Sequence, residues 1–573
     1  MYIVAAIFDK KAERYRLRGK HLEHFTASFP DYKQMLTKTK ACLGYFAGGG
    51  CAKDNALSLK IKSYEIKDSE ITLEFEPALQ TDIKSGYIAE ETRELSGKNK
   101  WLKDGMPPAV LFADKKACED MCECARLKDK LDSLMLQKDY KGALNEFKPL
   151  GEVKNDARFW NNEGILYRLG VACSRMAVTL KVKASETKKL GIARQYRDYC
   201  VEFLSRGAEI EEGARCASAL AYRYYSNVHE LTRPGERRDQ NLEEQIEKAN
   251  EWLSRAIEVY PQSVYNNYRK GKLIIEKQAP YLLFAKRSFG EGEARLLREI
   301  REVGEEHLAS AIAVYESLED AHAKEASRRE YAKALFVLGG YYLDDAYLPV
   351  HEFFLSRIAG KDSKVTIQPI SKMDMDSARE NLEKCFYAET DMPLTKLDIN
   401  ILASQIKNWT RSPIEKLYRL GCAHSGMAFI SLAEGNADKS AAQAKQALYY
   451  LEAAKNVSDR CTDKKRNTWH ISEKIAWANI ILGRQSKAAA LLSRASAGYI
   501  VNTYAIALLL TKTKDNLEKA REALAKAAKD RRNLAAGMTR VLLAYALGEK
   551  SIDKKNLSAK NIKLAGILGL KAV

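Results

Sequence analysis

The chain has 573 residues and a formal net charge of +18, with 46% hydrophobic and 30% charged residues. This composition is typical of a folded, soluble protein and excludes a largely disordered chain. The longest apolar runs, such as residues 504–510, are far shorter than the roughly 20 residues that cross a bilayer, so no membrane span is expected. The length predicts several domains or one long repeat array.

The first 116 residues have the pattern of a small α+β domain. Residues 56–77 alternate apolar and polar side chains on both sides of Lys67-Asp68-Ser69, which predicts a β-hairpin. The segments "MYIVAAIF" and "PAVLFA" read as further strands, and residues 20–40 as a covering helix. Because the apolar N-terminal stretch precedes the basic one, the reverse of a secretory signal, we expect a cytoplasmic protein.

Beyond about residue 117 the apolar period changes from two to between three and four, which predicts helices through to the C-terminus. One spacing of small, large and small residues recurs along this region and indicates a repeat array over residues 117–548. Its five occurrences are Ala249/Leu253/Ala256, Ala378/Leu382/Cys385, Ala447/Leu451/Ala454, Ala488/Leu492/Ala495 and Ala520/Leu524/Ala527. We expect residues 549–573 to form a basic C-terminal helix or tail.

The repeat region resembles the tetratricopeptide repeat family, whose unit is an antiparallel pair of helices. Residues 139–170 and 248–275 carry the best matches, and "KLYRLGCAH" adds Leu420-Gly421. The matching positions are Tyr140, Ala143, Phe147, Trp160, Gly164 and Tyr167 in the first segment, and Ala249, Leu253, Ala256, Pro261 and Gly271 in the second. The resemblance implies a mainly α chain, a solenoid of helix hairpins that follows the N-terminal domain.

Two segments depart from this pattern, residues 277–300 and 345–372. Long excursions from a repeat tend to fall on one functional face, so they are candidate inserted loops or partner-binding segments. The alternative is a divergent repeat with no special role.

The resemblance also implies a binding surface, because the first helix of each pair lines the concave wall of a solenoid. Its side chains in the best-matched repeats are polar, aromatic and basic, and Tyr and Arg often anchor protein interfaces. We therefore expect a partner protein with an acidic surface or segment; the alternative is an ordinary hydrated surface. The candidate residues are Arg158, Asn161, Asn162, Arg168, Tyr265, Tyr268, Arg269 and Lys272.

Basic residues near the C-terminus provide a second hypothesis, direct binding of nucleic acid. Residues 511–573 hold fifteen Lys and Arg against six Asp and Glu, so +9 of the net +18 lies there. Clustered cations gain from counterion release on a phosphate backbone, although solvated helix faces would give the same count. The candidate residues are Lys529, Arg531, Arg532, Arg540, Lys554 and Lys555.

Metal-ligating patterns are weak. The three cysteines of "ACEDMCECA", Cys118, Cys122 and Cys124, lack the paired spacing and fourth ligand of a structural zinc site. His21 and His24 lie one helical turn apart, but no carboxylate or Cys stands at a recognisable spacing. We expect no metal and no cofactor.

Catalytic motifs are also missing. The glycine-rich residues 44–55 lack the order of a phosphate loop, and "CAHSG" at residues 422–426 lacks the context of a nucleophile elbow. We expect a non-enzymatic scaffold. Proteins of this general build resemble adaptors or regulators of multi-component bacterial systems, including defence and CRISPR-associated ones.

Overall fold

The computed structural model divides the chain into two compact units. The first unit comprises residues 1–304 and 318–324, and the second comprises residues 305–317 and 325–573. The described residues are 2–7, 13–18, 42–46, 55–67, 70–85, 87–88, 90–91, 110–113, 115–183, 187–210, 214–231, 242–280, 291–343, 347–360, 371–405, 413–460, 469–496, 498–529, 536–555 and 557–573.

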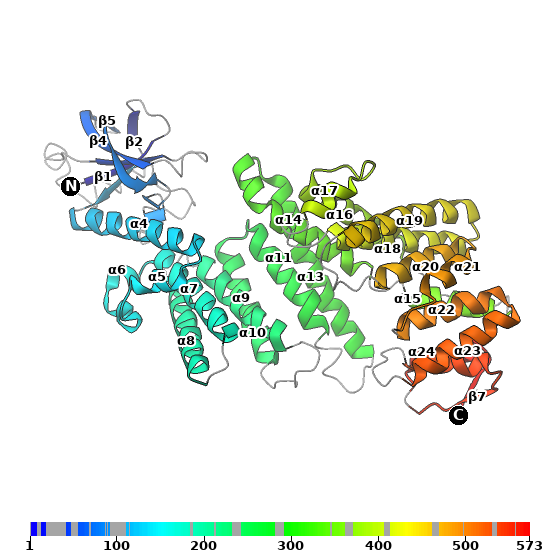
Figure 1. The fold of residues 1–573 in the computed structure, drawn as a ribbon. Helices are drawn as coiled ribbons and strands as arrows, with labels where there is room; N and C mark the ends of the chain where they lie inside the picture. Colours follow the sequence, from blue (N-terminus) through cyan, green and yellow to red (C-terminus); the bar gives the residue numbers. More distant parts are fainter. Residues whose placement is uncertain are drawn as a thin grey trace. The chain divides into compact units, whose positions relative to one another are not determined.

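A six-stranded sheet forms the N-terminal part of the first unit (Figure 1). Its order is β2-β5-β4-β3-β1-β6, in which β1 pairs with β3 in parallel and the other neighbours are antiparallel. The strands are β1 (Tyr2–Ile7), β2 (Glu13–Arg18), β3 (Cys42–Phe46), β4 (Asn55–Lys67), β5 (Glu70–Lys84) and β6 (Val110–Ala113).

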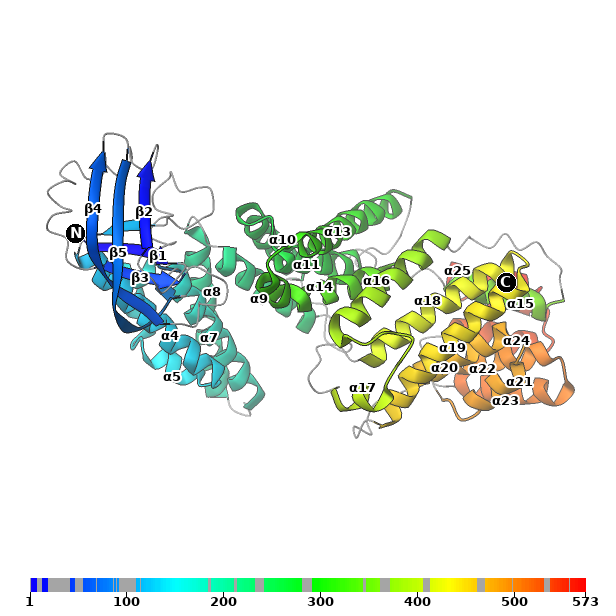
Figure 2. The same ribbon diagram turned by 90° about the horizontal axis from the view of Figure 1, so that it is seen from above.

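The hairpin of β4 and β5 lies where the sequence predicts it, with Lys67 opposite Glu70, and Figure 2 shows the two strands side by side. Its register is not the continuous one that simple alternation predicts. Ile61 faces Phe75, but a shift between Ile61 and Ser63 places Tyr64 opposite Leu73. Such irregularities increase the local twist of a hairpin. The helix expected over residues 20–40 lies outside the described residues.

Helices follow the sheet for the rest of the first unit, and α7/α8 and α9/α10 pack as antiparallel hairpins (Figure 1). Their facing sides are apolar and buried, with Leu166, Cys200 and Phe203 among the most enclosed residues. The elements are α4 (Lys115–Leu136), α5 (Tyr140–Asn145), η2 (Leu150–Asn155), α6 (Ala157–Trp160), α7 (Glu163–Lys183), α8 (Thr187–Glu209), α9 (Ala214–Leu231), α10 (Leu242–Val259), α11 (Val264–Leu273) and η3 (Ile274–Gln278).

The second unit continues with hairpins such as α18/α19 and α22/α23, while α13 and α14 contain residues of both units. The chain is therefore mainly α, a repeat of stacked helix hairpins, as the sequence predicts. The helices are α13 (Glu291–Ser317), α14 (Ala321–Tyr341), α15 (Tyr347–Ile358), α16 (Lys372–Thr390), α17 (Ile399–Gln405), α18 (Pro413–Ala433), α19 (Ala437–Arg460), α20 (Trp469–Ile481), α21 (Gln485–Leu492), α22 (Gly498–Thr511), α23 (Lys514–Ala528), α24 (Ala536–Ala546) and α25 (Ala559–Ile567).

Two of the recurring leucines, Leu382 and Leu451, pack against a glycine of a neighbouring helix. A Cβ atom at Gly421 of α18 would lie 2.7 Å from Leu451 Cδ2 of α19, and one at Gly339 of α14 would lie 2.8 Å from Leu382 Cγ of α16. Both distances are shorter than van der Waals contact, so only glycine permits these helix approaches. The small-large-small pattern thus marks the seam between two helices.

Helix ends repeat as well. Gly435 follows α18 and Gly483 follows α20, each with a positive φ (80° and 73°) that glycine adopts without strain. The next amide closes each helix on a carbonyl five residues back, from Asn436 to Ser431 and from Arg484 to Asn479, at 2.8 Å in both turns. These turns reverse the chain for the second helix of the pair.

The departures from the repeat are helical where they are described. Residues 347–358 form α15, which packs out of chain order against α22 and α25, and its Phe354, Leu355 and Ile358 join the large apolar core of the second unit. An inserted loop therefore does not fit residues 347–358, because buried apolar side chains fix this helix, while a partner-binding segment and a divergent repeat stay open as predictions. Near residues 277–300, η3 and the start of α13 are helical, and residues 281–290 lie outside the described part.

The C-terminus is a folded element rather than a tail. Strands β7 (Ser551–Ile552) and β8 (Lys571–Ala572) pair in parallel on either side of α25. Leu564 and Leu570 are buried in the same core as α15 and α22. Among the described residues, no helix is both long and apolar enough to span a bilayer. The predicted domain ranges 1–116, 117–548 and 549–573 remain predictions.

Candidate functional site

The candidate site is a cluster of aromatic and basic side chains on α9 and α11 of the first unit. We call this cluster the tyrosine–arginine face. Its α11 members lie three, four and seven residues after the first, which places them on one side of the helix. The face comprises Tyr222 and Tyr225 of α9, and Tyr265, Tyr268, Arg269 and Lys272 of α11.

Arg269 is the centre of this face. Its guanidinium carbon lies 4.0 Å from the ring centroid of Tyr222 and 3.9 Å from that of Tyr265, so tyrosines of two helices flank the cation. A cation over an aromatic ring gains about 0.5–2 kcal/mol per contact. The flanking rings hold the side chain in one orientation.

Arg269 also has an unsatisfied polar atom. Its Nη1 atom is buried and has no hydrogen-bond acceptor within the described part of the chain. A buried donor without an acceptor costs about 1–3 kcal/mol, and more when the group is charged. Tyr222, one of the flanking rings, is 46% exposed, so one wall of the sandwich borders solvent. An incoming carboxylate could provide the acceptor.

Lys272 adds a second positive charge, three residues after Arg269 on the same side of α11. Its Nζ atom lies 5.8 Å from the ring centroids of both Tyr225 and Tyr268, and 3.8 Å from the Glu276 carboxylate. Tyr225 also stacks on Tyr222, with centroids 6.4 Å apart. The contact between Tyr222 and Tyr225 therefore links the rings around Arg269 to the rings around Lys272.

Three of the four predicted α11 residues, Tyr265, Arg269 and Lys272, are partly accessible. The fourth, Tyr268, is only 5% exposed, so its assignment to the binding surface is wrong: it supports Lys272 from below. Sequence reasoning missed Tyr222 and Tyr225. The run "AYRYYSN" carries these tyrosines one helical turn apart and was the available signal.

The prediction that Asn162 and Arg168 line a binding surface is also wrong. The two side chains are buried and paired: Arg168 Nη1 donates to Glu90 at 2.9 Å, and Asn162 Nδ2 donates to Glu91 at 3.0 Å. Lys128, which is fully buried, lies 3.0 Å from Glu90 and 2.5 Å from Glu91. This network attaches the segment after β5 to α4 and α7.

Burial and the neighbouring charges shift the pKa values of the two carboxylates, Glu90 and Glu91. Burial alone would raise the pKa of Glu90, but the positive charges of Lys128, Arg215 and Arg168 outweigh burial and hold that pKa well below its usual range. For Glu91 the effect of burial is the larger one, so its pKa is raised despite the nearby positive charge of Lys128. The charged form of Glu90 therefore stabilises the folded state, whereas burial disfavours the charged form of Glu91.

Arg158 and Asn161 have partners inside the first unit. Arg158 Nη1 lies 2.7 Å from the Glu123 carboxylate and its Nη2 lies 2.7 Å from the Asp156 carboxylate. Asn161 Oδ1 accepts from Arg206 at 2.5 Å. Both side chains are thus paired with residues of other elements of the first unit, Glu123 of α4 and Arg206 of α8.

The residues proposed for nucleic acid do not share one role. Arg540 donates to the carbonyl oxygens of Lys555 (3.0 Å) and Asp553 (3.1 Å), and so fixes the loop between β7 and α25. Lys529, Lys554 and Lys555 are exposed. The remaining candidates, Arg531 and Arg532, lie outside the described residues, as do His21 and His24.

The described cysteines and acids do not gather into a metal site: no group of three or more His, Cys, Asp or Glu side chains is placed to hold an ion in that part of the chain. Cys118 and Cys124 face the interior, and Cys122 is partly exposed. A hydrogen bond from the Cys118 thiol lowers the pKa of Cys122.

Comparison with known proteins adds little. Neither a family model nor a curated protein matches the sequence. A solved structure described as a "Circular tandem repeat protein with novel repeat topology and enhanced subunit contact surfaces" aligns with 84% of this chain and 96% of its own, at 11% identity and a TM-score of 0.20. A TM-score this low establishes no shared architecture. The chain is thus defined by its own geometry as a helical-repeat protein, and the tetratricopeptide resemblance stays a prediction.

Proposed function

We propose that this chain is a non-enzymatic scaffold that binds a partner protein, and that the tyrosine–arginine face receives an acidic segment of that partner. The observation that carries the proposal is the position of Arg269 between the rings of Tyr222 and Tyr265, with Nη1 buried and lacking an acceptor. A carboxylate can accept two parallel N–H bonds from a guanidinium, which pairs the charge and the donors together.

The packing of the face supports binding at low entropic cost. Ordering a flexible side chain on binding costs about 0.5–1.5 kcal/mol, and the two rings order Arg269 beforehand. Arg and Tyr are also the residues that most often dominate the energetics of protein interfaces. Lys272 adds a second cation, so a segment with two spaced acids fits this face better than one with a single acid.

The hairpins resemble tetratricopeptide units, and we infer that they serve the same general purpose, presentation of a preformed surface. The contact between Gly421 and Leu451 supports this inference, because it places the Leu420-Gly421 motif at the seam of a helix pair. Bacterial defence or CRISPR-associated assemblies, which the sequence suggests by analogy, would be one setting for such a scaffold.

The experiment is a capture of proteins from lysate of the source cells with three immobilised full-length chains: wild type, R269E and R255E. Arg255 is the matched control, because it is exposed on α10 and lies over one ring, Trp252, at 5.6 Å. A partner of the face should be retained by wild type and R255E, and reduced at least tenfold with R269E. Equal capture by R269E, with an unchanged melting temperature, would remove the site.

The salt dependence of binding distinguishes the alternative, direct nucleic-acid binding, from the scaffold proposal. A protein that contacts several phosphates loses affinity steeply between about 50 and 200 mM salt. We expect no binding of generic duplex DNA or RNA at the lower salt. If binding occurs and K554E/K555E abolishes it, the exposed lysines of the β7–α25 loop carry a phosphate site and the scaffold proposal is incomplete.

A further inference from the structure

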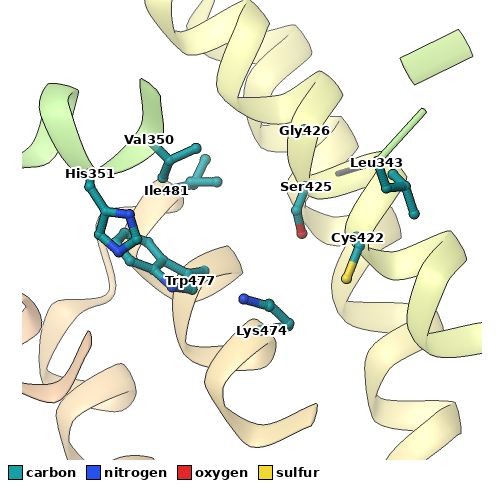
Figure 3. Close-up of a pocket in the computed structure, with 9 residues that line it drawn as sticks. All are labelled: Leu343, Val350, His351, Cys422, Ser425, Gly426, Lys474, Trp477 and Ile481. Carbon is teal, nitrogen blue, oxygen red and sulfur yellow. The ribbon is translucent and has the colours of Figure 1, made fainter. Parts of the chain in front are cut away.

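The second unit contains a small cavity between α15, α18 and α20, and Figure 3 shows the side chains around it. Its volume is about 40 Å³, and most of the lining surface is apolar, with Leu343, Val350 and Ile481 among the wall residues. This site is separate from the tyrosine–arginine face, which belongs to the first unit.

Trp477 provides an unsatisfied donor at this cavity. The residue is 4% exposed, and its ring packs edge-on against His351, with centroids 5.1 Å apart. Its Nε1 atom is buried and finds no acceptor among the described residues. An indole N–H can only donate, and a buried donor without an acceptor costs about 1–3 kcal/mol. A ligand that meets this atom therefore has to bring a hydrogen-bond acceptor.

The lysine at the cavity already has a counter-ion. Lys474, also a lining residue, is 9% exposed, and its Nζ atom lies 3.0 Å from the Glu473 carboxylate. The Thr503 hydroxyl donates to that carboxylate at 2.9 Å. A charged ligand would add a further buried charge with no counter-ion, at a penalty of several kcal/mol. The chemistry therefore favours an uncharged ligand.

The size and lining of the cavity argue against a single water molecule. One water needs only about 10–15 Å³ of such space, and it needs two to four polar partners. The cavity is larger than this, and Leu343, Val350 and Ile481 offer hydrocarbon. We propose that this cavity binds a small uncharged molecule whose carbonyl oxygen accepts from Trp477 Nε1 and whose hydrocarbon part packs against these three residues.

The test uses the full-length chain and three probes of similar size: butan-2-one, butyrate and pentane. The ¹H–¹⁵N signal of the Trp477 indole is assigned by its loss in W477F. Butan-2-one should shift this signal saturably, and should bind at least tenfold more tightly than either butyrate, which brings a charge, or pentane, which lacks an acceptor. In W477F, ligand-observed NMR should show at least tenfold weaker binding of butan-2-one.

A filling variant provides the control. Ser425 also lines the cavity, so S425L should occupy the space and abolish the shift, whereas S486L on the exposed side of α21 should leave it unchanged. The proposal is overturned if butan-2-one leaves the Trp477 signal in place, if butyrate or pentane binds as tightly, or if W477F binds butan-2-one as well as wild type. The W477F measurement decides the question even where S425L does not fold.

Discussion

Gly421 of α18 and Leu451 of α19 approach so closely that a Cβ atom at residue 421 would lie 2.7 Å from Leu451 Cδ2 and 3.2 Å from the Ala447 carbonyl oxygen. The same relationship joins Gly170 of α7 to Leu204 of α8 in the first unit, with 2.6 Å to Cδ2. A glycine beneath a leucine is therefore a repeated device that sets the distance between helices of a pair.

Replacement of this glycine should destabilise the second unit. The Cβ atom of Gly421→Ala pushes the Ala447 backbone and the Leu451 side chain of α19 away from α18. Overpacking of this kind costs about 1–3 kcal/mol. Chemical denaturation measures the loss. The control is Gly566→Ala in α25, where nothing lies within 4 Å of the added Cβ; it should be neutral or stabilise by up to about 1 kcal/mol. Similar stability of the two variants would contradict the claim that Gly421 is required for the close approach of α18 and α19.

Gly164 is required for the buried ion network. A Cβ atom there would lie 2.5 Å from Lys128 Nζ and closer still to Glu90 Oε1, so Gly164→Ala should separate the pair. We expect a loss of about 3 kcal/mol, the cost of disrupting a buried ion pair, measured by thermal and chemical unfolding. Gly191→Ala on an exposed part of α8 is the control, since its Cβ meets nothing within 4 Å. If Gly164→Ala leaves the free energy of unfolding unchanged, the ion network contributes little to stability.

The depressed pKa of Glu90 predicts a specific pH dependence. A carboxyl with a lower pKa in the folded state stabilises the fold above its unfolded pKa, near 4.5, and this contribution is lost as pH falls toward the folded pKa. Glu90→Gln should therefore cost about 2 kcal/mol at pH 7, because each cation keeps a second carboxylate. Chemical denaturation at several pH values measures the difference in the free energy of unfolding between wild type and variant, which should become smaller below about pH 4.5. A difference that grows in acid would show that the pKa of Glu90 is raised in the folded state, not lowered.

Cysteine reactivity provides another check. The hydrogen bond from Cys118 lowers the pKa of Cys122, whereas burial raises the pKa of Cys173 above its usual range and that of Cys200 to about 11. Since the thiolate is the reactive form, iodoacetamide at pH 7.5 should modify Cys122 first among these residues, at least tenfold faster than Cys200. Peptide mapping by mass spectrometry measures the order. Faster labelling of Cys173 or Cys200 would show that this part of the first unit is open.

Sequence patterns predicted the seams of the fold well, because each depends on local spacing. Leu382 and Leu451 stand in the small-large-small pattern, and both pack on a glycine. The course of α15 could not be predicted in this way. Its apolar residues, such as Phe354, identify a buried segment, but nothing in local spacing shows that it packs against α22 and α25.

The candidate site was predicted only in part for the same reason. Arg269 and Lys272 follow from helical spacing on α11, but Tyr222 comes from another helix and depends on tertiary packing. Arg168 looked like a surface residue, because its carboxylate partner Glu90 is 78 positions away in the sequence. Long-range pairing decides which polar side chains are buried, and sequence periodicity does not report it.

The most direct test of the proposed binding face is a charge swap between the two proteins. Once capture has identified a partner, each acidic residue of its bound segment is changed to Lys, and affinities are measured by isothermal titration calorimetry for wild type and R269E. A direct ion pair at Arg269 predicts that R269E weakens binding at least tenfold, about 1.4 kcal/mol, and that one Lys variant of the partner restores it. Additive losses in every combination would contradict a direct ion pair at Arg269.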